Sequence, residues 1–334
     1  MLIRFAVENY KSFKEQQVFS MAAGKQTRHS SHCFTVDGKR LLKSSFFFGA
    51  NASGKSNFVR ALDFMRRVTI MGSRAMQYDD CFFRIDSVCK EKPGVFQIDF
   101  VAEQTIFSYG FAINYLTHEF CAEWLYRIDS SEKETCIFER EPGKQITTEL
   151  RLNKKSKLRF NIYCEDLKVD ELLLNEVGNK NLDDDSDLHD FIVAYKWFNN
   201  LIVVYPGSHA RNKNDFFLNP APNTDSMIDM LRAFDTGIEE ITKGKQPAEE
   251  AFSFLPDEVK KDVLNDLEQT MKSKLQDGTH CKIDIGDYQF EISIENEEII
   301  AEKIMLDHGN PAELFELSDE SDGTKRLFDL IPLY

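Results

Sequence analysis

Gly49-Ala50-Asn51-Ala52-Ser53-Gly54-Lys55-Ser56 is the stretch that decides the fold of this 334-residue chain. It matches the pattern G-x-x-x-x-G-K-[ST], in which glycines let the backbone curl round a chain of phosphates with its N–H groups pointing inward. We expect Lys55 to reach the β- and γ-phosphates of a nucleotide and the Ser56 hydroxyl to ligate Mg²⁺. The stretch therefore predicts a nucleotide-binding loop, and a Gly-rich turn with an incidental lysine is the alternative.

The residues on either side of this loop follow the order of strand, turn and helix that the motif requires. Phe46-Phe47-Phe48 predicts a short buried strand immediately before the loop. From Ser56 to about Met71 the apolar side chains are spaced for one face of a helix, namely Phe58, Leu62, Met65 and Val68. Such a helix would add the positive end of its dipole to a phosphate site.

The rest of the chain predicts strands first and helices later. Strands are expected over Leu2–Val7 and in an antiparallel meander between about 95 and 165, with members over 95–100, 107–115, 120–128 and 150–163. Residues 166–200 are polar and acidic and predict a solvated loop, followed by a connection rich in Pro, Asn and Gly over 206–224. Helices are expected over 226–241 and about 255–275, then a hairpin over 283–294 that turns at Gly286-Asp287.

Composition and charge limit the class of protein. With 42% hydrophobic and 12% aromatic residues the chain is globular, and its length suggests about two domains. The net charge of -15 is uneven, because residues 1–75 carry 13 Lys or Arg and 4 Asp or Glu, whereas 76–334 carry 28 and 52. We expect an anionic ligand in the basic first quarter. The acidic remainder argues against a protein that coats nucleic acid along its whole length.

Cysteine usage indicates a reducing compartment. The seven cysteines are never closer than eight residues, so no C-x-x-C pair is present for zinc or redox chemistry. The N-terminus lacks the layout of a signal peptide, and the longest aliphatic run, residues 201–205, is far short of the ~20 residues that span a bilayer. We expect a cytoplasmic protein with no membrane partner.

Other patterns give weaker hypotheses. His29 and His32 lie three residues apart near Cys33, where an exposed loop is favoured over a metal site. The acidic run 183–187 is more typical of a solvated loop than of a carboxylate cluster for a metal. Tyr10 and Phe13 could stack on a base, and core packing is the alternative. The sequence contains neither H-E-x-x-H nor G-x-S-x-G.

Beyond the loop, several stretches carry a family resemblance. Asn9-Tyr10-Lys11-Ser12-Phe13, followed by Phe48 to Asn57, resembles the head domain of ABC-type ATPases in the SMC, RecF and OLD branch. More narrowly, the chain is similar to AAA-family ATPases of the RloA and AbiL abortive-infection type. Supporting stretches are Trp124-Leu125-Tyr126, Trp197-Phe198, 234–238 and 320–327.

The resemblance implies a second nucleotide contact near the C-terminus. Glu320-Ser321-Asp322-Gly323-Thr324 stands where the signature loop of ABC-type ATPases closes over nucleotide bound by the opposite subunit. Ser321 would offer a hydroxyl and Gly323 an N–H to the γ-phosphate. From the residues alone, Ser321 is also a good N-cap for a helix through Leu327. Asp322 departs from the family, which has glycine there.

The same family has a Walker B strand, four apolar residues that end in Asp-Glu, and no such sequence is present. The chain is therefore expected to be truncated before this strand, or to receive the missing carboxylates from elsewhere. Asp99, after Val95-Phe96-Gln97-Ile98, is the nearest substitute, but Phe100 stands where the second acid should be. We expect ATP binding with little hydrolysis, so whether this chain is itself an enzyme stays open.

The predicted fold is an α/β P-loop NTPase of the ABC-head type. It would consist of an ATPase lobe over 1–94, an antiparallel β subdomain over 95–165, a mostly helical insertion over 166–280 and a return to the lobe over 281–334. The resemblance implies that Gly49 to Asn57 bind ATP and that Lys55 is catalytic.

The resemblance also implies a cellular role. The chain would be the nucleotide-sensing subunit of an anti-phage system, a homodimer or higher oligomer that controls a separate nuclease-like effector, with nucleic acid as a trigger. Two alternatives remain open, namely a DNA-repair ATPase of the RecF kind and a non-hydrolysing protein that holds a partner when ATP is bound.

Overall fold

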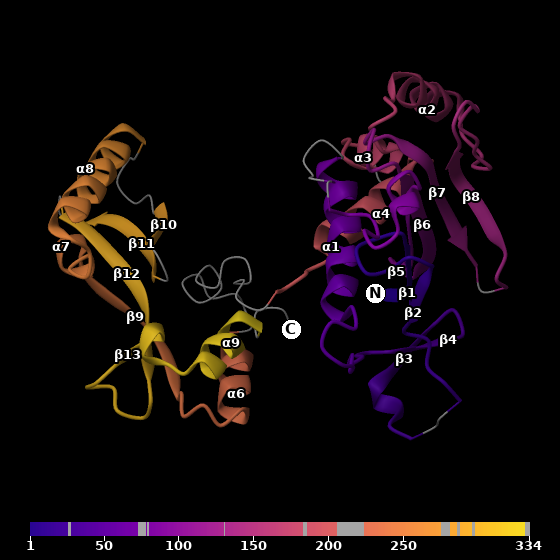
Figure 1. Ribbon diagram of the computed structural model, residues 1–334. Helices are drawn as coiled ribbons and strands as arrows, with labels where there is room; N and C mark the ends of the chain where they lie inside the picture. Colours follow the sequence, from indigo (N-terminus) through magenta and orange to yellow (C-terminus); the bar gives the residue numbers. More distant parts are fainter. Residues whose placement is uncertain are drawn as a thin grey trace. The chain divides into compact units, whose positions relative to one another are not determined.

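The chain forms two compact units, Met1–Val203 and Val204–Tyr334, in the computed structural model (Figure 1). The structure describes residues 1–25, 28–72, 78, 80–129, 131–182, 186–205, 224–274, 281–285, 288–295 and 298–330. The predicted connection over 206–223, the aspartates at 183–185 and the hairpin turn at 286–287 lie outside these residues.

A six-stranded antiparallel sheet is the centre of the N-terminal unit. Its strand order is β2-β1-β5-β6-β7-β8, with β1 Leu2–Glu8, β2 Gln17–Ser20, β5 Gly94–Ala102, β6 Thr105–Ile113, β7 Phe120–Ile128 and β8 Glu134–Arg140. Alternate residues of β5 are buried, as expected of a strand with one face on a core, and Phe96, Ile98 and Phe100 are fully buried. Phe5 of β1 pairs with Ile98, and Ile98 pairs with Tyr109 of β6.

Helices α1 Lys55–Met71, α3 Leu173–Gly178 and α4 His189–Asn200 pack on this sheet (Figure 1). Helix α1 contributes Ala61, Phe64, Met65 and Val68 to the main core. Helix α2 Lys154–Asp166 joins the same core through Phe160, whose ring lies 6.3 Å from that of Phe191. A hairpin of β3 Cys33–Val36 and β4 Lys39–Leu42 forms a smaller core with β5 and β6, and short 3-10 helices span Ser30–His32 and Ser87–Lys90.

The C-terminal unit is built on a second antiparallel sheet. Its long central strand, β12 Glu298–Asp307, pairs along its length with β9 Glu240–Pro247 and β11 Tyr288–Glu295, which leads to β10 Cys281–Ile285. Helices α7 Ala248–Ala251 and α8 Asp257–Lys274 pack on this sheet through Phe252, Leu267 and Phe290. The remaining elements are α6 Thr224–Ala233, β13 Phe315–Glu316, the 3-10 helix Leu317–Asp319 and α9 Asp322–Leu330.

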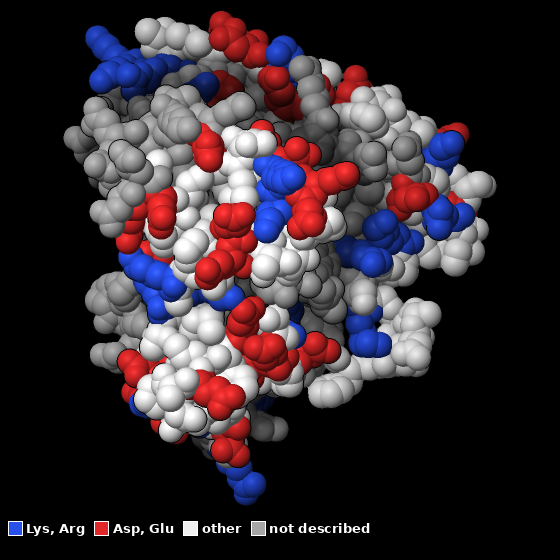
Figure 2. All heavy atoms as spheres, turned by 90° about the vertical axis from the view of Figure 1, so that its left-hand side faces the viewer, with Lys and Arg blue, Asp and Glu red and all other residues white. Residues whose placement is uncertain are grey.

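Charged side chains of both signs are interspersed over the face that Figure 2 shows. In the C-terminal sheet, Lys245 forms ion pairs with Glu295 at 2.7 Å and with Glu302 at 2.8 Å. Lys243 lies 3.8 Å from Glu291 and 3.7 Å from Glu302. These lysines neutralise neighbouring acids, so they do not form a basic surface of the kind that phosphate backbones require.

Several predicted elements are confirmed by the structure. The first strand, the helix after the loop, three strands of the meander and the helix over about 255–275 lie within a few residues of their expected bounds. The hairpin over 283–294 is present as β10 and β11. Along α8, Leu267 is buried, whereas Val259 is 46% exposed. Within the described residues no helix is long and apolar enough to cross a bilayer.

Other predictions were wrong, for reasons of local structure. Residues 150–163 are not a strand, because Asn153 caps a helix by accepting a hydrogen bond from the Ser156 N–H at 2.9 Å. The expected loop over 166–200 contains α3 and α4, whose buried leucines and phenylalanines lie among the acids. The helix expected over 226–241 ends at Ala233, because the following residues turn into β9.

The structure also groups the chain differently from the four predicted segments. Because β1 pairs with β5, the expected lobe over 1–94 and the β subdomain over 95–165 share one sheet. Because β9 pairs with β12, part of the expected helical insertion belongs to the sheet of the last segment. Strand β8 completes the first sheet and, like β9, was absent from the prediction.

Candidate nucleotide-binding loop

The loop predicted to hold phosphate lies at the surface, directly before α1. Gly54 stands at the N-cap of α1 with a φ of 91°, and Ala52 has a φ of 64°, so both residues lie in the left-handed region that favours glycine. The Lys55 ammonium donates hydrogen bonds to the carbonyl oxygens of Gly49 and Ala50, both at 2.7 Å. A cation is therefore held against the carbonyls of an exposed loop, where the oxygens of a phosphate would have access to it.

A turn from the N-terminus supports this loop from behind. The Ser12 hydroxyl accepts a hydrogen bond from the Asn57 amide at 3.0 Å, and the Asn57 carbonyl oxygen accepts one from Arg60 at 3.2 Å. A Cβ at Gly54 would lie 2.9 Å from the Ser12 hydroxyl and 3.1 Å from the Phe13 ring. Only glycine fits this close approach together with its positive φ. Asn57, predicted to bind nucleotide, is directed to Ser12 and Arg60.

Buried hydrogen bonds fix the same turn at Asn9, which is 2% exposed. Its amide donates to the carbonyl oxygens of Cys89 at 2.8 Å and Lys92 at 2.9 Å, and its side-chain oxygen accepts from the Phe83 N–H at 3.1 Å. The backbone oxygen of Asn9 accepts from the Tyr115 hydroxyl at 2.9 Å. Every polar group of the Asn9 side chain is thus satisfied inside the core.

The C-terminal end of α1 is anchored by a separate buried network. Asn175 of α3 donates to the carbonyl oxygens of Thr69 and Ile70, both at 2.8 Å. The last carbonyls of a helix have no partner within it, so this amide supplies what the helix end lacks. Tyr109, from β6, is fully buried, and burial together with the nearby Glu123 carboxylate raises its pKa well above the usual value.

Glu123 of β7 holds this network in place. Its side chain is fully buried and accepts hydrogen bonds from the Leu173 N–H at 2.7 Å, the Leu174 N–H at 3.0 Å and the Tyr109 hydroxyl at 3.0 Å. Desolvation raises the pKa of Glu123 to about 7, against the opposite effect of these backbone hydrogen bonds. No local pattern of residues indicates this role, because the two amides come from α3, some fifty residues later.

The structure corrects the strand that was predicted before the loop. Residues 46–48 are neither strand nor buried, since Phe46 is 79%, Phe47 45% and Phe48 91% exposed. Phe47 alone packs inward, with its ring 4.9 Å from both Phe19 and Phe58. The apolar run predicted burial, but no described strand pairs with this segment, and an unpaired segment gains no ladder hydrogen bonds.

The second predicted contact lies in the C-terminal unit. Ser321 precedes α9, and its hydroxyl accepts from the Thr324 N–H at 3.2 Å, the geometry of an N-cap. Glu320 is held 2.6 Å from His308, and Lys325 donates to the Ser318 carbonyl oxygen at 2.7 Å. Gly323 is exposed, and a Cβ there would meet nothing closer than the Ser321 hydroxyl at 3.6 Å. The capping role is thus present, and the nucleotide contact stays a prediction.

Other candidate residues have structural partners. Asp99 accepts from the Ser108 hydroxyl at 2.7 Å and lies 3.6 Å from Arg4, so its carboxylate is engaged within the sheet. Tyr10 is 3% exposed, with its hydroxyl 3.3 Å from the Arg60 carbonyl oxygen, and it belongs to the core. His29 and His32 lie with their rings 5.8 Å apart, and the described residues contain no group of three or more potential metal ligands.

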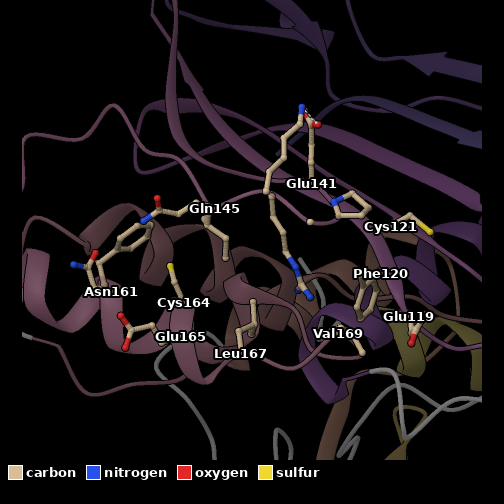
Figure 3. A pocket seen from close by; sticks show the side chains of 16 residues that line it. Glu119, Phe120, Cys121, Glu141, Gln145, Asn161, Cys164, Glu165, Leu167 and Val169 are labelled. Carbon is tan, nitrogen blue, oxygen red and sulfur yellow. Dashed lines mark ion pairs between the residues drawn. The ribbon is translucent and has the colours of Figure 1, made fainter.

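A cavity of about 560 Å³ lies between β7, the turn after β8 and α2 (Figure 3). Arg140 and Lys144 contribute positive charge to it, and Glu119, Glu141 and Glu165 contribute negative charge. Burial raises the pKa of Cys164 to about 12 and also raises that of Cys121, so both thiols in the wall stay protonated at neutral pH. The cavity shares no residue with the loop at 49–56, and its mixed charge does not favour a polyphosphate.

Comparison with known families identifies the chain. Residues 44–334 match a family model described as AAA domain, putative AbiEii toxin, Type IV TA system. The chain therefore belongs to this AAA family, and an AAA domain implies nucleotide binding, commonly with Mg²⁺. The loop at 49–56 lies within the matched region. No curated protein matches the sequence.

Proposed function

We propose that this AAA-family chain binds Mg-ATP through the loop at 49–56. The observation that carries the proposal is the Lys55 ammonium, held by two carbonyl oxygens of an exposed loop at the N-terminus of a long helix. Phosphate oxygens bear more charge than carbonyls, so the β- and γ-phosphates would replace these partners. The dipole of α1 would add a further attraction. Ser56, exposed in the first turn, would ligate Mg²⁺.

Binding of Mg-ATP to purified protein tests this proposal, with Lys55→Ala as the decisive variant. Loss of a charge-assisted contact of about 2–3 kcal/mol should weaken binding roughly 30- to 160-fold. Lys43→Ala is the matched control, because Lys43 is an exposed lysine ahead of the loop with no side-chain partner among the described residues. Equal affinity of the wild type and the Lys55 variant, measured by calorimetry, would refute the site.

Turnover is proposed to be low. The sequence has no apolar run that ends in Asp-Glu, and Asp99 is engaged with Ser108 and Arg4. Positioning of phosphates can persist where the carboxylates for hydrolysis are missing. Phosphate release at saturating Mg-ATP should therefore stay close to that of Lys55→Ala, and release clearly above that variant would contradict this part of the proposal.

The finer proposal is a nucleotide-sensing role in anti-phage defence. It is supported by the resemblance to abortive-infection ATPases and by the family description, which names a toxin of a toxin–antitoxin system. ATP occupancy would control a separate effector, with Ser321 and Gly323 completing the site in a second subunit. Protection of cells against phage should be lost in Lys55→Ala, and protection that survives this change would separate defence from nucleotide binding.

A further inference from the structure

Helix α2 carries a stripe of exposed side chains with positive charges at one end and negative charges at the other. Six exposed residues make up this stripe, in the order Lys154, Lys155, Leu158, Ile162, Glu165 and Asp166. At about 100° per residue, all six fall within a sector of about 120° on the helix. The buried Ser156 and Phe160 lie outside that sector and face the core of the N-terminal unit. The stripe is therefore the solvent side of a helix that is anchored on its other side.

The stripe has no partner in the part of the chain that the structure describes. Leu158 is 63% exposed and Ile162 45% exposed. Neither of its lysines and neither of its acids forms an ion pair or a side-chain hydrogen bond with a described residue. Other lysines of the same region are paired, for example Lys168 with Glu171 at 3.2 Å and Lys180 with Glu176 at 2.6 Å.

The order of these residues is complementary to itself. If a second α2 lies antiparallel across a twofold axis beside position 160, Lys154 faces Asp166 and Lys155 faces Glu165 of the other helix. Leu158 then faces Ile162, and each pair occurs twice because the contact is symmetric. A parallel arrangement would place like charges together. Antiparallel helices also place the positive end of one dipole beside the negative end of the other.

We propose that this stripe is a homotypic contact, in which α2 of one chain packs antiparallel against α2 of a second copy. A nucleic acid or an anionic membrane would be attracted to the lysine end and repelled by Glu165 and Asp166 at the other end, so the charge pattern favours a second copy. A pair of thirteen-residue helices covers less than the ~1,200 Å² of a standard interface, so the association is weak and reversible. It does not depend on nucleotide.

Sedimentation velocity on the whole chain, without nucleotide, tests the apolar centre of the contact. We expect a concentration-dependent monomer–dimer equilibrium that weakens several-fold as salt is raised, because the flanking ion pairs are exposed. Leu158→Lys should weaken dimerisation at least tenfold. Leu116→Lys, at a leucine that is 52% exposed outside the stripe, is the matched control and should change nothing. A wild type that stays monomeric at all concentrations, or equal loss in the control, would overturn the proposal.

Charge reversal tests the antiparallel order. Lys154→Glu with Lys155→Glu makes the stripe acidic throughout, and Glu165→Lys with Asp166→Lys makes it basic throughout, so each double variant should lose self-association. An equimolar mixture of the two should recover a heterodimer. Lys260→Glu with Lys261→Glu on α8 is the control pair and should dimerise like the wild type. Failure of the mixture to associate, with both variants folded by circular dichroism, would refute the contact.

Discussion

The two ends of α1 are held in opposite ways. At its N-terminal end Lys55 bonds, among the described residues, only to the loop that precedes it, and this loop is open to solvent. At its C-terminal end Val68 and Thr69 are fully buried, and Asn175 satisfies two carbonyl oxygens. A helix of seventeen residues is about 25 Å long, so support and ligand binding are separated by its whole length. Burial fixes the axis of α1, and exposure leaves its N-terminus free for a ligand.

The largest loss of stability is expected from Glu123→Ala, at the buried end of α1. Removal of the carboxylate leaves the Leu173 and Leu174 N–H groups and the Tyr109 hydroxyl without their acceptor in the core. We expect the free energy of unfolding to fall by about 3–4 kcal/mol, measured by urea denaturation. Lys55→Ala, at the exposed end, should change it by no more than about 0.5 kcal/mol. Similar losses at both ends would contradict the contrast.

A second effect at the buried end depends on pH. Because desolvation raises the pKa of Glu123 from 4.5 to about 7, the folded chain binds this proton more tightly than the unfolded chain. The resulting stabilisation is fully present below about pH 4.5 and is lost as the pH rises through about 7, by about 3 kcal/mol in total. The free energy of unfolding of the wild type, relative to that of Glu123→Gln, should therefore fall by about 3 kcal/mol between pH 4.5 and 7.5. A difference that stays constant between pH 4.5 and 7.5 would show that Glu123 does not titrate there.

The same contrast explains what the sequence could and could not predict. The loop and α1 follow from local signals, since a spaced glycine and lysine and a helical repeat of apolar residues lie within twenty-five positions. The anchor was not predictable in this way. Glu123 is a lone acid in a strand, and its burial depends on the N-terminus of α3 arriving from elsewhere in the chain.

Two further predictions were wrong because they followed from the chemical type of the side chains alone. Helix α2 was missed because lysines dominate its first turns. Its helical signals are the Asn153 cap and the buried Ser156 and Phe160, four residues apart. The three phenylalanines at 46–48 predicted burial, but burial of a strand requires strands paired with it, and no described strand pairs with them. Apolar composition alone therefore gave the wrong environment for the segment that leads into the loop.

The smallest effect on stability is expected at this exposed end, from Phe46→Ser combined with Phe48→Ser. Both rings are mostly in solvent, so their loss should change the free energy of unfolding by no more than about 0.5 kcal/mol. Phe47→Ser is the internal comparison, because its ring packs on Phe19 and Phe58, and it should cost about 1–2 kcal/mol. If the double variant loses more than Phe47→Ser in urea denaturation, then Phe46 and Phe48 are covered in solution. In that case the segment before the loop would be supported as firmly as the far end of α1, and the contrast between the two ends would fail.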